Sequence, residues 1–105
     1  MEIKSQSFRT GATMLTSGVN AYISLITNFH LFIKQCLEKH KSCDWGDCCD
    51  SDWKDNDASI EIGERIISVY HLPEDFTKVI NQDTKIWIIT ERDRSATTVL
   101  FPSEY

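Results

Sequence analysis

The residues most able to do chemistry are concentrated in one stretch, KHKSCDWGDCCDSDWKDND, at positions 39 to 57. It holds three cysteines, one histidine, two tryptophans and six aspartates. Thiolates and imidazole are zinc ligands, carboxylates are calcium ligands, and a cysteine beside a histidine can act as a nucleophile with its base. The same aspartates can instead form an acidic surface for a basic partner. The spacing of the residues decides among these chemistries.

A zinc site would use His40, Cys43, Cys48 and Cys49, with Cys36 as a further thiolate. Their spacing, H-x2-C-x4-C-C, lacks the paired C-x2-C units of structural zinc sites, and two adjacent cysteines seldom both reach one ion. We therefore expect small, partly buried thiols, kept reduced in a reducing compartment. The sequence predicts no metal and no cofactor.

A calcium loop of the EF-hand type needs oxygen ligands at fixed places, and four residues fall on the first, third, seventh and twelfth: Asp50, Asp52, Asn56 and Glu61. Lys54 puts a positive charge where another oxygen ligand belongs. Asp55 replaces the glycine that allows the sharp turn of such a loop. We therefore interpret these aspartates without calcium.

Nucleophilic catalysis would pair Cys43 with His40. The neighbouring aspartates would raise the pKa of the thiol, and no third residue that orients the histidine can be assigned. We therefore predict no catalytic residue and no enzymatic activity. The alternative hypothesis is a small metal-binding or hydrolytic protein that uses His40, Cys43 and Asp44.

Several aspartates lie near the expected start of a helix, where carboxylates interact favourably with free N–H groups and with the helix dipole. This capping role still leaves their charge at the surface. We predict that the charge binds a basic protein surface. The predicted partner-binding residues are five aspartates, called the acidic block, and two arginines of a later turn: Asp47, Asp50, Asp52, Asp55, Asp57, Arg92 and Arg94.

The helices that position these residues follow from the spacing of apolar side chains. Residues 17–41 carry them three and four positions apart, which predicts one long helix or two helices divided at Asn28. Thr16 or Ser17 can cap the first turn. A shorter helix is predicted over residues 51–62, and Gly63 stands where a left-handed residue ends a helix.

β-branched and aromatic runs predict the strands, at residues 7–15, 65–72, 85–90 and 96–102. The last two should form an antiparallel hairpin. KIWIIT, residues 85–90, is apolar on both faces and is expected at the centre of the sheet. The predicted fold class is α+β, with an antiparallel sheet of three to four strands packed against two to three helices in one domain, residues 1–105.

This supply of apolar side chains exceeds what one sheet face and its helices need. We therefore expect self-association, a homodimer being the simplest closed form. The competing interpretation is that the connector between the second and third strands covers the remaining face internally, through Phe76, Val79 and Ile80.

Composition narrows the class of partner. The chain has 105 residues, a formal net charge of −5 and a pI near 5.0, which disfavours direct binding to nucleic acid. Met1–Gln6 lacks the pattern of a signal peptide, so we expect a cytoplasmic protein. Polar residues interrupt the apolar segment 19–37, so no membrane span is predicted.

Several motifs together carry a family resemblance: His40 with DWGD at 44–47, ND at 56–57, G-x-R-I-I-S-x-Y at 63–70, and KIWIITERDRSATTVLFPSEY at 85–105. They resemble a family of small uncharacterised proteins encoded on bacterial plasmids and integrative elements. The resemblance singles out further residues: His40, Asp44, Trp45, Glu91, Arg92, Asp93, Arg94 and Tyr105. Cys43 stands where the family commonly has glycine, which further weakens a shared zinc site.

Taken with the acidic block, the resemblance predicts a non-enzymatic accessory protein of a mobile element that acts by binding other proteins. In its most specific form, the hypothesis is an inhibitor of a host defence complex that grips nucleic acid, of the anti-restriction or anti-CRISPR type.

Overall fold

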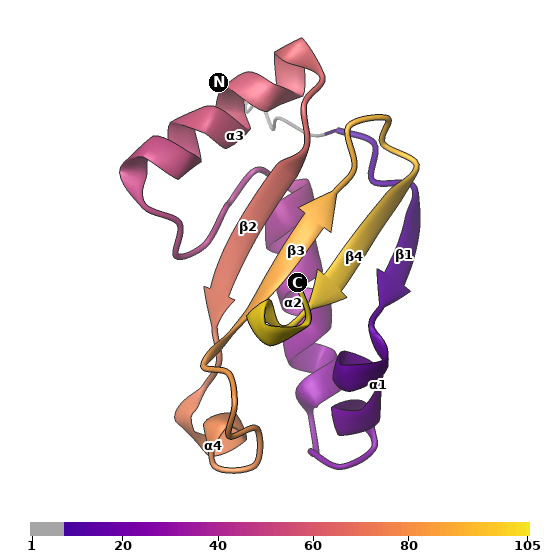
Figure 1. The fold of residues 1–105 in the computed structure, drawn as a ribbon, viewed down its shortest axis with the longest axis vertical. Helices are drawn as coiled ribbons and strands as arrows, with labels where there is room; N and C mark the ends of the chain where they lie inside the picture. The colour runs from indigo at the N-terminus through magenta and orange to yellow at the C-terminus, as the bar shows by residue number, and fades with distance from the viewer. Residues whose placement is uncertain (1–7) are drawn as a thin grey trace, which may run out of the picture.

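The computed structural model describes residues 8–105; Ser7, where the first strand was predicted to begin, and Met1–Gln6, on which the signal-peptide prediction rests, lie outside these residues. Its helices are α1 (Ser17–Ile23), α2 (Phe29–Lys41), α3 (Asp50–Ile62) and α4 (Glu74–Thr77), followed by a 3-10 turn, η1 (Pro102–Glu104). Its strands are β1 (Ala12–Leu15), β2 (Ile66–His71), β3 (Lys85–Thr90) and β4 (Ala96–Leu100) (Figure 1). The predicted α+β class is confirmed.

The four strands form one sheet in the order β1-β4-β3-β2, so β3 is an inner strand, as predicted. The β3–β4 hairpin is antiparallel, with Ile88 opposite Val99, and β2 is antiparallel to β3. The pair β1–β4 is parallel, so the prediction of a purely antiparallel sheet is wrong for this pair. Because most of the chain separates these two strands, no tight turn dictates their relative direction.

Residues 17–41 form two helices. Thr16 caps α1 by accepting a hydrogen bond at its Oγ1 from the Val19 N–H, at 3.3 Å. Asn28 adopts the left-handed conformation, with φ of 70°, immediately before α2. Asparagine tolerates this conformation better than most residues, which explains why the chain changes direction here.

The hydrophobic core lies between the sheet and the first two helices. Ile86, Ile88 and Val99 of the sheet belong to the same buried cluster as Phe29 and Ile33 of α2. Burying one such side chain contributes about 2 kcal/mol relative to leaving it exposed. This cluster holds α2 against the sheet and thereby fixes the segment that follows it.

The connector joins this same core instead of covering the opposite face. Phe76 packs edge-to-face against Phe29 and Phe32 of α2, while Ile80 is buried and Val79 is exposed. The competing interpretation, in which the connector covers the second face of the sheet, is therefore wrong.

The opposite face of the sheet is covered in part by the C-terminal turn. Figure 1 shows α2 behind the sheet and the C-terminal turn in front of it. Tyr105 packs against Trp87 of β3, with ring centroids 5.4 Å apart. At the outer edge, β1 is exposed along its whole length, including Met14 and Leu15. Self-association stays a prediction, and β1 is the sheet edge open to it.

Within residues 8–105, no helix is long and apolar enough to cross a membrane.

Candidate functional site

The DWGD segment runs beside the outer edge of β2. Asp47 N–H donates to the Val69 carbonyl at 2.7 Å, and Val69 N–H donates to the Trp45 carbonyl at 3.2 Å. Gly46 forms a parallel bridge with Val69. Its φ of +72° is one that side-chain-bearing residues rarely adopt. The segment therefore acts as a short additional strand.

Two more side chains form hydrogen bonds with the outer edge of β2. Asn56, on α3, donates from Nδ2 to the Ile67 carbonyl at 2.7 Å and accepts from the Ile67 N–H at 3.2 Å. The amide of Asn56 thus pairs with the strand as another backbone would. At the far end of β2, His71 N–H donates to Asp47 Oδ2 at 2.8 Å. The outward-facing N–H and C=O groups of Ile67 and Val69 and the N–H of His71 are bonded, so most of β2 is not a free sheet edge.

Trp45 anchors the segment inside the protein. Its side chain is fully buried, and its Nε1–H donates to Asp57 Oδ1 at 2.9 Å. Asp44 accepts the Tyr70 hydroxyl at its carbonyl, at 2.8 Å, and the Gly46 N–H at its carboxylate, at 3.1 Å. Asp44, Asp47 and Asp57 are therefore structural: each contacts a defined donor within the fold.

His40 lies fully buried in a chain of hydroxyl groups that the sequence analysis did not identify. Its Nδ1 is 2.6 Å from Ser68 Oγ and its Nε2 is 2.8 Å from Thr90 Oγ1. Thr90 bonds to Thr97, whose hydroxyl donates to the Thr10 carbonyl.

A carbonyl can only accept, so the Thr97 proton points to Thr10, the Thr90 proton to Thr97, and the His40 Nε2 proton to Thr90. In the neutral ring Nδ1 accepts from Ser68, so both nitrogens are occupied. Burial lowers the pKa of His40 from 6.5 to about 4, which favours the neutral form.

The hydrogen bonds of His40 argue against the metal-binding or hydrolytic alternative. A ligand or a general base needs an accessible nitrogen lone pair, and the ring of His40 offers none. Burial raises the pKa of the Cys43 thiol, with a further contribution from the charge of Asp57, and raises the pKa of Cys36 to about 12. Within residues 8–105, no group of three or more His, Cys, Asp or Glu side chains is placed to hold one metal ion.

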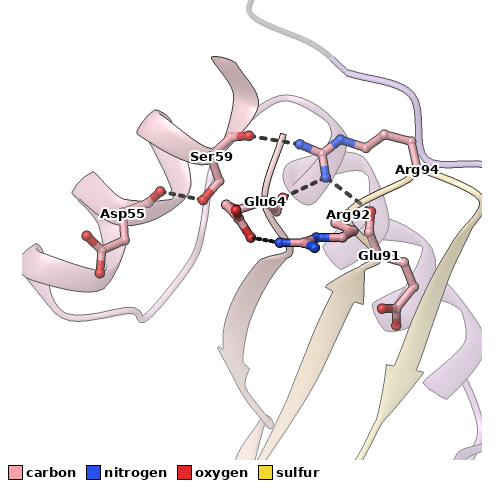
Figure 2. Close-up of polar contacts among 6 residues, drawn as sticks. All are labelled: Asp55, Ser59, Glu64, Glu91, Arg92 and Arg94. Carbon is pink, nitrogen blue, oxygen red and sulfur yellow. Dashed lines mark hydrogen bonds and ion pairs between the residues drawn. The ribbon is translucent and has the colours of Figure 1, made fainter. Parts of the chain in front are cut away.

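The two arginines predicted to bind a partner belong to the turn between β3 and β4, which lies beside the C-terminal end of α3 (Figure 2). Arg92 Nη2 donates to Glu64 Oε1 at 2.6 Å, an exposed ion pair. Arg94 donates to three backbone carbonyls: Ser59 at 2.9 Å, Glu64 at 2.7 Å and Glu91 at 3.1 Å. The guanidinium of Arg94 therefore contacts the main chain and ties the hairpin turn to the end of α3.

We expect Arg94→Lys to lower the free energy of unfolding by about 1.5 kcal/mol, because lysine keeps the charge but cannot span three carbonyls. The matched change Arg92→Lys should leave stability unchanged, since an exposed ion pair contributes little. Urea unfolding of both variants measures the difference. Equal stabilities would show that the guanidinium of Arg94 does not brace the turn.

The remaining aspartates of the acidic block have no structural partner. Asp50, Asp52 and Asp55 lie exposed on α3, and within residues 8–105 their carboxylates make no hydrogen bond or ion pair. Asp50 and Asp52 lie in the first turn, where they complement the helix dipole, while Cys49 occupies the N-cap position and its side chain makes no capping hydrogen bond to the helix backbone. The predicted side-chain capping is therefore absent, and these three carboxylates face solvent.

A cavity of about 390 Å³ lies between α3 and the second face of the sheet. The sequence analysis did not predict it. Its lining comes from α3, from two alternate positions of β2, and from the residues around them: Cys48, Asp52, Asp55, Asn56, Ser59, Arg65, Ile67, Val69, Trp87 and Tyr105. One signal was available in the sequence: an asparagine inside a helix is unfavourable unless its side chain has a partner, and Asn56 is such a residue.

Comparison with known protein families, curated proteins and solved structures finds no match to this chain. The family resemblance of its motifs therefore stays a prediction, and its function is argued from the geometry above.

Proposed function

We propose that this chain is a non-enzymatic protein that acts by binding another protein through the exposed acidic surface of α3, formed by Asp50, Asp52 and Asp55. Its partner presents a basic surface. In the specific form suggested by its motifs, the chain is an accessory protein of a mobile element, and the partner is a host defence complex that targets nucleic acid.

One observation carries the proposal: the polar residues of the cluster divide into two sets. Asp44, Asp47 and Asp57 each accept a hydrogen bond from within the fold. The carboxylates of Asp50, Asp52 and Asp55 are exposed and make no such bond among the described residues. Asp50 and Asp52 complement the helix dipole, but none of the three carboxylates is held by another side chain or by a backbone group within residues 8–105.

Charge complementarity indicates the kind of surface that fits. A groove built for nucleic acid is lined with lysine and arginine, and a row of carboxylates can occupy it. The net charge of −5 would also speed the approach to a basic partner at low salt.

The metal-binding or hydrolytic alternative is the weaker candidate, because both nitrogens of His40 are engaged by hydroxyl groups in the interior. It would require His40 to leave a fully buried position.

The test is capture of host proteins with tagged protein, followed by affinity measurement on each partner identified. We expect a nucleic-acid-binding protein whose affinity falls at least tenfold in the triple variant Asp50→Asn, Asp52→Asn and Asp55→Asn, and falls with added salt. Circular dichroism should be unchanged, since the three carboxylates make no hydrogen bond or ion pair within residues 8–105 and the dipole interaction of an exposed aspartate contributes only about 0.3–1 kcal/mol.

The control removes the same three charges elsewhere, by Glu38→Gln, Glu74→Gln and Asp75→Asn, all exposed residues outside α3. It should bind as the wild type does. Equal losses in both variants would attribute binding to net charge alone and contradict a role for the α3 surface.

A further inference from the structure

The cavity beside α3 has an apolar floor and a polar wall. Its floor is apolar, formed by Ile67 and Val69 of β2 and by Trp87 of β3. Its volume of about 390 Å³ is at the lower end of the range for ligand sites, about 300–1,000 Å³. The site is therefore large enough for one long side chain and its attached main chain.

One stripe of α3 forms the polar wall. Asp52, Asp55, Asn56 and Ser59 all line the cavity, at the three- and four-residue spacing that places them on one helix face. Asn56 and Ser59 are buried and bonded, Asn56 to Ile67 and Ser59 Oγ to the Asp55 carbonyl. Asp52 and Asp55 are exposed at the rim, with carboxylates that make no hydrogen bond or ion pair among residues 8–105.

Trp87, on the floor of the cavity, carries an unsatisfied hydrogen-bond donor. Trp87 Nε1 is shielded from solvent and has no hydrogen-bond partner among the described residues. Buried donors are rarely left without a partner, because the missing bond is a free-energy cost that the fold carries. The Nε1 atom is closed to solvent in this structure, so an acceptor on an occupant would reach it only if the indole ring shifts.

Resting on the proposed function, we infer that this cavity receives one arginine side chain from the protein partner. The aliphatic stem packs on Ile67 and Val69, and the guanidinium reaches Asp52 and Asp55. Arginine fits better than lysine, because its planar head can bond two carboxylates at once and is less strongly hydrated. The site would thus convert a general acidic surface into specific recognition of one residue.

The cavity's own basic residue does not fill this role. Arg65 is exposed, donates from Nη2 to the Tyr105 hydroxyl at 2.6 Å, and lies over the Tyr105 ring at 5.6 Å. These contacts hold Arg65 against Tyr105, and Arg65 forms no ion pair with Asp52 or Asp55. The carboxylates of the rim stay available.

The test uses small probes, so it needs no identified partner. The isotope-labelled protein is titrated with the peptide acetyl-Gly-Arg-Gly-amide and with matched peptides carrying lysine or citrulline, the uncharged analogue of arginine. We expect saturable shifts of the Trp87 indole N–H resonance, ranked arginine, lysine, then citrulline. The buried indole of Trp45, bonded to Asp57, is the internal control and should not move.

Two charge variants distinguish the cavity from the general acidic surface. Asp52→Asn combined with Asp55→Asn should weaken arginine-peptide binding by at least tenfold. Asp50→Asn removes a charge from the same helix but does not line the cavity, and it should change binding less than twofold. Similar losses in both variants, or equal shifts with citrulline, would overturn the inference.

The outcome also separates this inference from the proposed function. Peptide binding at the cavity without any captured host partner would contradict the function and leave the arginine site standing. Capture of a partner whose affinity falls equally with Asp50→Asn and with the double variant, and no peptide shift at Trp87, would overturn the arginine site and support the function.

Discussion

Gly46→Ala should lower the free energy of unfolding by about 4 kcal/mol, the largest effect expected of any single change considered for this protein. A Cβ at this position would lie 2.1 Å from the Val69 carbonyl oxygen and 2.6 Å from Tyr70 Cδ1. Both neighbours are held in place, Val69 by the bridge to the DWGD segment and Tyr70 by the buried core. The segment would have to move away from β2.

Gly63 provides the matched control. It also has a positive φ, +77°, but a Cβ there would meet nothing within 4 Å. Gly63→Ala should therefore cost only the conformational strain, about 1 kcal/mol. Urea unfolding of both variants measures the difference. If the two alanine variants are equally stable, close packing of the DWGD segment against β2 is contradicted.

Stability should fall by about 3 kcal/mol as the pH is lowered from about 6.5 to about 4, because of His40 alone. Burial lowers the pKa of His40 from 6.5 to about 4 in the folded protein. Between these values the unfolded chain binds a proton at His40 that the folded protein does not bind, so acid favours unfolding. The contribution is fully present above pH 6.5 and is lost as the pH falls through this window.

The control is His40→Gln, which keeps a side chain able to bond Ser68 and Thr90 but does not titrate. This variant should be less stable at neutral pH and should show a flatter profile between pH 6.5 and 4. Asp47 acts at lower pH: its backbone hydrogen bond from His71 lowers the pKa of its carboxyl below 3.8. A wild-type profile as flat as that of His40→Gln would contradict a neutral, buried imidazole.

Elements with local signals were predictable from the sequence. The β3–β4 hairpin follows from two β-branched runs around the polar turn ERDRS, and the end of α3 follows from Gly63. Asn28 marked a division of residues 17–41, but the sequence left one helix and two helices equally open. The direction of β1 could not be predicted, because its partner β4 is distant in the chain and no turn connects them.

The candidate site was less predictable than the elements, because segments distant in the sequence form it. His40 was read as a candidate for chemistry, but Ser68 and Thr90, 28 and 50 residues away, occupy its ring. Ile67, Val69 and Trp87 appeared only as strand residues, and no periodicity indicates that they form the floor of a cavity with α3. Such a cavity exists only when the sheet and the helix are packed together.

The sequence by itself determined that this protein is acidic, that its polar residues gather in one stretch, and that this stretch lies between helical segments and precedes the main strands. Only the tertiary structure decided which aspartates hold the fold and which are left exposed. The six carboxylates are chemically alike, but only those that meet a free donor of β2, of Trp45 or of their own turn are engaged. That encounter is set by packing across the chain, which local spacing does not encode.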